Sequence, residues 1–256
     1  MILFHWDPDG DIPLTVLANR DEFHDRPALQ ADFWQDHQDI LAGRDERRAG
    51  TWLGVTAGGR FAAVTNYRSP RDMQPGGRSR GELPVAFLNA RDRSMAFLES
   101  ILAEGDQWAG FNLLVYDGVD LAYGSNRDTA GPQLITPGVH GLSNALLNTS
   151  WPKVDSGKQE LEALLSGSVE ESGAEEGWLN VLASREEAED DLLPDTGIGL
   201  EKERLLSARR IVSEGYGTRC STLVRIGWDG QMEFVEKTWI PRSLDQDTVA
   251  FSIEPL

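Results

Sequence analysis

Three charged residues, Arg20, Asp21 and Glu22, directly follow an apolar run that ends at Asn19. Side chains displayed where a strand ends often form binding or catalytic sites, because a rigid sheet positions them. These three charged residues therefore indicate a polar cluster at the end of a strand. The alternative is a turn in which the arginine and the two carboxylates pair with one another.

Three further strand ends carry Asn or Arg. Asn66 ends the strand that comes after a glycine-flanked, bulky segment at 50–56, and its amide could donate to an oxyanion. Asn144 ends the apolar run that begins at Gly138, and Arg219 begins a strand after Gly215. Each segment alone is also explained by turn and packing roles. Together with Arg20 they suggest one polar site.

Several familiar catalytic motifs are missing from the sequence. The four histidines show no HExxH or HxxxH spacing, which disfavours a zinc hydrolase, although any one of them could be an axial haem ligand. No glycine-rich phosphate loop and no GxSxG elbow occurs. Cys220 is the only cysteine, so an internal disulfide is excluded, and its place in an apolar strand favours an inert thiol.

These residues need sheets to position them, and the chain supplies strand signals in pairs. Apolar, β-branched segments are separated by turn sequences such as Asp-Pro-Asp-Gly-Asp at 7–11. We predict four antiparallel hairpins, with strands at 2–6 and 12–19, 52–56 and 60–66, 111–116 and 121–125, and 221–228 and 231–238. Apolar residues at helical spacing predict helices at 81–89, 94–103, 156–165, 176–188 and 200–212. The glycine- and arginine-rich stretch at 69–80 is expected to be an exposed loop.

This order of strands and helices predicts an α+β protein in which two sheets pack face to face with helices outside. No repeat and no long linker divides the 256 residues, so a single domain over 1–256 is expected. The formal charge is −18, which argues against a nucleic-acid partner and against docking on anionic lipid. No segment is long and apolar enough for a transmembrane span, and the cysteine content fits a reducing, cytoplasmic location.

The string Asn19-Arg20-Asp21-Glu22, with Arg26-Pro27 just after it, resembles the signature of the NRDE-motif proteins, also called the transport-and-Golgi-organisation family. The resemblance extends in order over essentially the whole chain. Matching segments are Leu41-Ala42-Gly43-Arg44-Asp45, Gly50-Thr51-Trp52-Leu53-Gly54, Val64-Thr65-Asn66-Tyr67, Ser79-Arg80-Gly81-Glu82-Leu83, Gly110-Phe111-Asn112-Leu113, Ser125-Asn126-Arg127, Gly141-Leu142-Ser143-Asn144-Ala145-Leu146, Trp151-Pro152-Lys153, Leu193-Pro194-Asp195 and Gly215-Tyr216-Gly217-Thr218-Arg219.

The family is similar to N-terminal-nucleophile hydrolases, so the resemblance implies a four-layer α/β/β/α sandwich of mainly antiparallel sheets. In those enzymes an N-terminal Cys is nucleophile and base. The resemblance implies that Arg20 and Asp21 stand beside it, that Asn66 and Asn144 supply amides, and that Arg219 lowers a thiolate pKa or anchors a carboxylate. Family members usually begin Met-Cys, whereas this chain begins Met1-Ile2. Hydrolysis would therefore require a start different from the one in the sequence.

Three functions follow as expectations. The first is a binding or trafficking protein for an amphipathic ligand, with no required cofactor and with haem or an acyl-CoA as cargo; the resemblance carries this idea. Its expected ligand-binding residues are Asn19, Arg20, Trp52, Asn66, Tyr67, Arg68, Arg80, Asn144 and Arg219. The second is an amide or thioester hydrolase. The third is a protein-interaction module, whose contact surface could be the segment 151–206, which carries 15 acidic and 5 basic residues.

Overall fold

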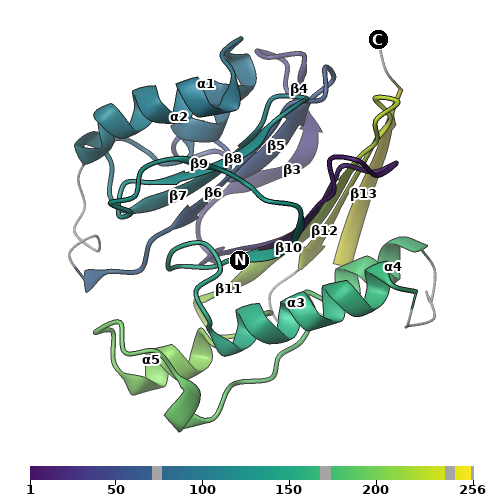
Figure 1. Cartoon of the computed structure of the whole chain (residues 1–256). Coiled ribbons are helices and arrows are strands. Elements are labelled where there is room, and N and C mark those ends of the chain that lie inside the picture. The colour runs from purple at the N-terminus through teal and green to yellow at the C-terminus, as the bar shows by residue number, and fades with distance from the viewer. Residues whose placement is uncertain (71–76, 168–173, 240–245, 255–256) are drawn as a thin grey trace.

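Two antiparallel sheets face each other, and a layer of helices covers the outer face of each (Figure 1). The computed structural model describes residues 1–70, 77–167, 174–239 and 246–254. The α+β, four-layer α/β/β/α arrangement predicted for the chain is confirmed.

The first sheet, called sheet A, is formed by strands from both ends of the chain and by one strand from the middle of the chain. Its order is β10-β1-β2-β11-β12-β13, and every neighbouring pair is antiparallel. The strands are β1 (Ile2–Trp6), β2 (Leu14–Phe23), β10 (Gly138–Leu142), β11 (Tyr216–Ile226), β12 (Met232–Trp239) and β13 (Gln246–Ile253). The register of β11 on β2 shifts between Thr218 and Cys220, beside the predicted polar run.

The second sheet, called sheet B, follows chain order as a meander from β3 to β9. Its strands are β3 (Ala28–Phe33), β4 (Ile40–Asp45), β5 (Leu53–Thr56), β6 (Phe61–Asn66), β7 (Phe111–Tyr116), β8 (Leu121–Ser125) and β9 (Gln133–Leu134). All four predicted hairpins are confirmed, as β1–β2, β5–β6, β7–β8 and β11–β12. Strands β3, β4, β9 and β13 were not predicted, because they lack a tight-turn signal between clean apolar runs.

Helices α1 (Glu82–Asn89) and α2 (Ser94–Ala103) pack on sheet B, while α3 (Pro152–Leu165) and α4 (Ala174–Asn180) pack on sheet A. Helix α5 (Leu200–Leu205) and the short turns Gly105–Gln107 and Asp190–Leu192 complete the helical elements of the described residues. No helix in those parts of the chain is both long and apolar enough to cross a membrane.

Two predicted helices are shorter than expected, because tertiary hydrogen bonds take over their backbone. The helix predicted at 176–188 ends at Asn180, and beyond it the carbonyl of Leu182 accepts from a side chain of β2. The helix predicted at 200–212 ends at Leu205, where Lys153 Nζ donates to the carbonyl of Leu206. The loop predicted at 69–80 lies partly outside the described residues.

Strand alternation divides the interior into three apolar clusters. In β1, Ile2, Phe4 and Trp6 face sheet B and fill the space between the sheets, while Leu3 faces α3 and α4. A third cluster lies between sheet B and the helices α1 and α2. Successive residues of one strand therefore lie on opposite faces of sheet A, which decides where the polar run of β2 points.

Candidate functional site

The four residues of the polar run belong to β2 and are shared between its two faces. Arg20 reaches into the space between the sheets, where Asp45 of β4 accepts its hydrogen bond. Asn19 points the other way and donates to the carbonyls of Leu182 and Arg209, on the helical side. The polar residues that were predicted to form one cluster therefore make two separate sets of contacts. Arg20 pairs with Asp45 of the other sheet rather than with its neighbours in the sequence.

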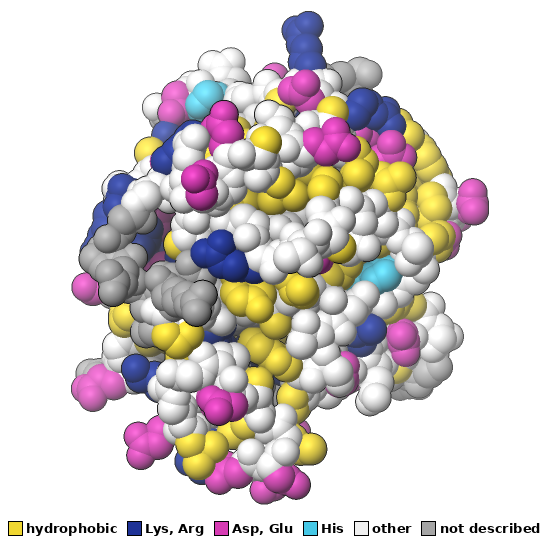
Figure 2. Space-filling model, turned by 60° about the vertical axis from the view of Figure 1, so that its left-hand side comes forward, with side chains coloured by type: hydrophobic (Ala, Val, Ile, Leu, Met, Phe, Trp, Pro, Cys, Tyr) yellow, Lys and Arg dark blue, Asp and Glu magenta, His cyan; other side chains and the backbone are white. Residues whose placement is uncertain are grey.

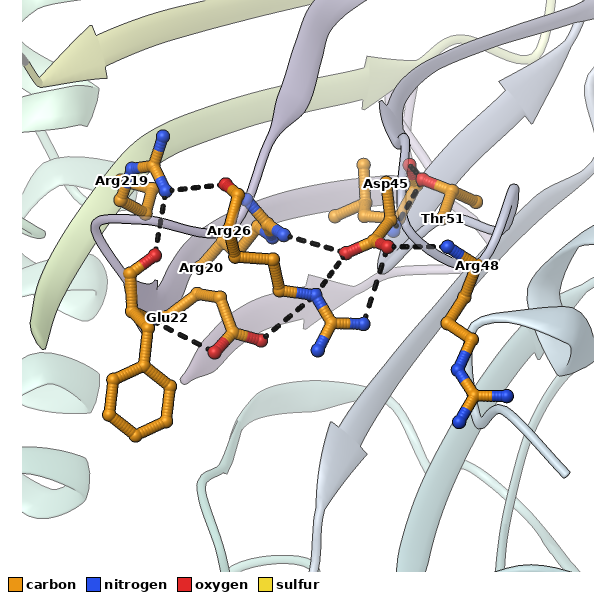
Figure 3. Close-up of polar contacts among 9 residues, drawn as sticks. Arg20, Glu22, Arg26, Asp45, Arg48, Thr51 and Arg219 are labelled. Atoms are coloured by element: carbon orange, nitrogen blue, oxygen red, sulfur yellow. Dashed lines mark hydrogen bonds and ion pairs between the residues drawn. The ribbon is translucent and has the colours of Figure 1, made fainter. Parts of the chain in front are cut away.

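Asp45 is the centre of the first set, which we call the inter-sheet cluster (Figure 3). Its carboxylate lies 3.1 Å from Arg20 Nη2 and 2.5 Å from Arg26 Nε, and it accepts the backbone N–H of Arg48 at 3.0 Å. Glu22 lies 3.6 Å from Arg26 on its other side. Burial raises the pKa of Asp45, but the hydrogen bond and charge of Arg26, the Arg48 N–H and the charge of Arg20 outweigh burial and lower it.

Arg219 closes the same cluster from β11. Its guanidinium donates to the carbonyls of Phe23 and Arg26, at 2.9 and 3.0 Å, and so fixes the turn that follows β2 (Figure 3). Its neighbour Cys220 is buried on the inner face, where burial and the nearby Glu236 raise the pKa of the thiol. A raised pKa keeps a thiol protonated and unreactive at neutral pH.

Trp52 is held between Arg20 and Gly43. The Arg20 guanidinium carbon lies 4.1 Å from the centre of the indole ring, a cation–π distance. On Gly43 a side-chain carbon would lie only 2.4 Å from Trp52 Cη2 and Cζ2. The absence of a side chain at Gly43 therefore leaves room for the Cη2–Cζ2 edge of the indole against β4.

We expect Gly43→Ala to lower the free energy of unfolding by about 1–3 kcal/mol, because the methyl group must push the Trp52 ring off Arg20. Thermal unfolding and near-ultraviolet circular dichroism measure the two effects. Gly58→Ala is the matched control, since a Cβ there meets only Thr56 Oγ1 at 3.8 Å. Equal stability of the two variants would show that the ring does not need the space.

A second set of polar residues lies where β6 and β10 end and α3 begins. We call it the hollow cluster, because its residues surround a small hollow. Arg68 Nη1 lies 2.7 Å from Glu203 of α5, and its Nη2 donates to Asn144 Oδ1 at 3.4 Å. The Arg68 guanidinium also lies 4.9 Å from the centre of the Trp151 ring. Lys153 Nζ donates to the carbonyl of Leu206 at 2.7 Å.

The cations of the hollow cluster are desolvated. Burial lowers the pKa of Lys153 to about 8, with Asp21 opposing and Arg68 reinforcing the shift. Burial also lowers the pKa of Arg68, against the charge and hydrogen bond of Glu203. Asp21 itself accepts a hydrogen bond from Thr218 Oγ1 at 2.6 Å. Tyr216 lies near both sets: burial and the charges of Asp21 and Glu22 raise the pKa of its phenol, and the charges of Arg68 and Arg20 oppose that rise.

These residues surround a small hollow of about 10 Å³, room for about one water molecule. Its walls are Arg68, Trp151, Pro152, Lys153, Pro194, Glu203, Leu206 and Ser207. The arrangement offers two buried cations and one carboxylate beside apolar walls. Such a set of groups can bind a small anionic group and exclude water around it.

The remaining predicted residues lie close by but do not line the hollow. Asn66 exposes its side chain, and its backbone carbonyl accepts from Asn144 Nδ2 at 3.0 Å. The backbone N–H of Tyr67 and the guanidinium of Arg80 both donate to the carbonyl of Gly110. Ile2, at the position where the family pattern has Cys, is 3% exposed and packs between the sheets.

Asp45, Trp151, Lys153 and Glu203 are among the residues of these clusters that were not predicted as site residues. Asp45 ends an apolar strand and Lys153 follows Trp-Pro at a helix start, so each carried a usable signal. Glu203 sits in a run of exposed charges, and its burial is decided by packing. No group of three or more His, Cys, Asp or Glu within the described ranges is arranged for a metal ion.

Comparisons with known proteins match almost the whole length of this chain to the same family. The family described as "Transport and Golgi organisation 2" matches residues 1–241. The chain is 37% identical to the "Transport and Golgi organization protein 2 homolog" of Bos taurus, covering 94% of this chain and 93% of that protein. It is 38% identical to the Homo sapiens homolog, covering 95% and 94% of the two chains, respectively.

The Drosophila melanogaster "Transport and Golgi organization protein 2" is 27% identical, over 90% of this chain and 87% of that protein. Among solved structures, a Caenorhabditis elegans N-acylethanolamine-hydrolyzing acid amidase ortholog superposes with a TM-score of 0.41 and 10% identity. That match covers 87% of this chain and 91% of the other.

Proposed function

Since this chain belongs to the Transport and Golgi organisation 2 family, we propose that it binds and carries an amphipathic small molecule whose anionic end pairs with Arg68 and Lys153 when the side chains around the hollow move apart. The single cysteine fits a reducing compartment, and we assign this role to the cytoplasm. No nucleic acid and no resident cofactor is part of the proposal.

The observation that carries the proposal is the charge around the hollow. The protein has a formal charge of −18, yet this hollow has two buried cations against the single carboxylate Glu203 among its walls. Burying a cation without a matching anion is costly, so an incoming carboxylate or phosphate would gain from neutralising it.

The hollow is small. Its volume of about 10 Å³ is room for about one water molecule, far below the roughly 300–1,000 Å³ of pockets that enclose a whole ligand, so an anionic end group enters only if the side chains of the walls move apart. The exposed Leu192 and Leu200 flank the wall residue Pro194 in the chain. Figure 2 shows the side that lies on the left in Figure 1, and hydrophobic side chains gather in a band across it. We propose that the apolar body of the ligand lies along this surface.

Haem and long-chain acyl-CoA both have this build, with propionates or phosphates on an apolar body. We expect Lys153→Met to weaken binding of whichever of these binds by about tenfold, because one charge-assisted contact is lost. Affinity of the unaltered protein should also fall as pH rises from 7 to 9, since Lys153 loses its proton through a pKa of about 8. Titration followed by haem absorbance, and calorimetry with palmitoyl-CoA, measure both effects.

Lys202→Met on α5 is the matched control, because it removes an exposed lysine next to Glu203 without touching the hollow. It should bind like the unaltered protein. Absence of binding to both probes, or equal affinity and pH dependence in the two variants, would contradict the proposal.

A hydrolase of the N-terminal-nucleophile type is the chemical alternative. It needs a thiol at position 2, where this chain has Ile2 packed in the apolar interior. The binding proposal needs no nucleophile.

A further inference from the structure

Two cations share one indole ring on the outer face of sheet A. The guanidinium carbon of Arg210 lies 3.4 Å from the centre of the Trp239 ring, and the Lys237 ammonium lies 4.9 Å from the same centre. Lys237 and Trp239 are two residues apart on β12 and so share a face. None of these residues lines the hollow.

The cations at Trp239 have no carboxylate partner among the described residues, whereas nine arginines there do. Among the described residues Arg20, Arg26, Arg44, Arg68, Arg78, Arg93, Arg204, Arg209 and Arg225 all pair with carboxylates. Arg185, Arg210 and Lys237 form no ion pair anywhere in the described part of the chain. Burial and the like charge of Arg185 lower the pKa of Arg210 to about 10. Arg210 and Lys237 are therefore held at one ring, with Arg185 close enough for its charge to act on Arg210, in a chain that has 42 acidic residues.

A hydrogen-bond chain fixes this arrangement before any ligand arrives. Trp239 Nε1 donates to Ser221 Oγ at 2.9 Å, and Ser221 Oγ donates to Asn19 Oδ1. Asn19 Nδ2 then donates to the carbonyl of Arg209, at 2.8 Å, next to Arg210.

Arg210 also holds the backbone next to the third cation, Arg185. The N–H of Arg210 donates to the carbonyl of Ser184 at 2.7 Å, directly before Arg185. A rigid backbone thus holds these like charges close together despite their repulsion. Such a site is preorganised for an anion, because the cations are ordered when the protein folds rather than when the ligand binds.

We propose that Arg185, Arg210 and Lys237 around Trp239 bind a phosphate-bearing ligand, as a site separate from the hollow. A phosphate group carries close to two negative charges at neutral pH and offers several acceptor oxygens. It therefore matches this group of neighbouring cations better than a single carboxylate does, and Arg binds it in a forked geometry. The phosphate could belong to a soluble phosphorylated molecule or to a lipid headgroup.

Calorimetry with inorganic pyrophosphate at low ionic strength tests the soluble source, and sedimentation with vesicles containing phosphatidic acid tests the lipid source. We expect Arg210→Gln and Lys237→Gln each to weaken binding to the true ligand at least tenfold. Arg91→Gln is the matched control, because Arg91 is exposed in the loop between α1 and α2, on the opposite outer layer. Circular dichroism confirms that each variant is folded, and two variants allow the test to stand if one fails.

Loss of pyrophosphate binding in both site variants but not in Arg91→Gln supports a soluble ligand. Loss of vesicle binding alone, in the same pattern, supports a headgroup. Binding of neither probe, or equal weakening by all three substitutions, would overturn the proposal. None of these outcomes depends on the hollow. If the phosphate site fails its test, the proposed function is still decided by its own experiment.

Discussion

Asp45→Asn is expected to lower the free energy of unfolding by about 3–5 kcal/mol, because it leaves the buried Arg20 guanidinium facing a neutral amide. For a chain of this length that corresponds to a fall in Tm of about 6–20 °C. The substitution keeps the shape of the side chain, so the loss reports charge and hydrogen bonding across the two sheets. Chemical denaturation at pH 7 measures it.

Asp36→Asn is the matched control. Asp36 also pairs with an arginine through two short contacts to Arg44, but its side chain is 51% exposed, and exposed pairs contribute less than about 1 kcal/mol. The double substitution Arg20→Met, Asp45→Leu should recover much of the loss, since it removes both buried charges. Equal effects of Asp45→Asn and Asp36→Asn would show that the inter-sheet cluster is not a stabilising element.

Acid should remove the advantage of the unaltered protein over Asp45→Asn. The folded pKa of Asp45 is lowered, so its contribution is fully present above the unfolded value, about 3.9, and is lost as pH falls through the folded value. The stability gap between the two proteins should therefore narrow below about pH 4. A gap that stays constant with pH would mean that the charge of Asp45 is not what stabilises the pair.

Asn19→Asp is the second substitution with a large expected effect, about 3–5 kcal/mol. The amide of Asn19 donates to two carbonyls and accepts from Ser221, all in the interior. The substitution keeps the acceptor but turns the donor into an oxygen that faces the carbonyls of Leu182 and Arg209. Each unsatisfied buried group costs about 1–3 kcal/mol, and an unpaired buried carboxylate costs more.

The pH dependence identifies the cause. Burial raises the pKa of the introduced carboxylate, so the variant should regain stability relative to the unaltered protein as pH falls and the acid can donate one hydrogen bond. Asn89→Asp, at the exposed end of α1, should change stability by less than 1 kcal/mol. A loss for Asn19→Asp no greater than that of Asn89→Asp would exclude Asn19 as the connection between β2 and the helical layer.

The same substitution should also disturb the cation site at Trp239. Asn19 holds Ser221 and the backbone of Arg209, which position the indole and Arg210, respectively. Its effect on pyrophosphate binding is thus a consequence of position, whereas Arg210→Gln acts on charge.

The sequence alone determined the secondary structure wherever apolar runs are separated by a tight turn. The pairs β1–β2, β5–β6, β7–β8 and β11–β12 follow from apolar runs joined by glycine-bearing turns, and α2 begins and ends where the helical spacing predicts. Packing two such sheets face to face, with helices outside, is the arrangement that buries every apolar face. The four-layer architecture therefore needed no knowledge of long-range contacts.

Only the tertiary structure decided what the polar residues do. The sequence shows Asn19, Arg20 and Asp21 side by side, but the pleat of β2 sends Arg20 to Asp45 and Asn19 to segments 163 and 190 residues away. Likewise Lys153, Glu203 and Arg210 look like ordinary surface charges until folding buries the first two and stacks the third on Trp239. Partners of charged side chains depend on long-range geometry, because burial sets the cost that each partner must offset.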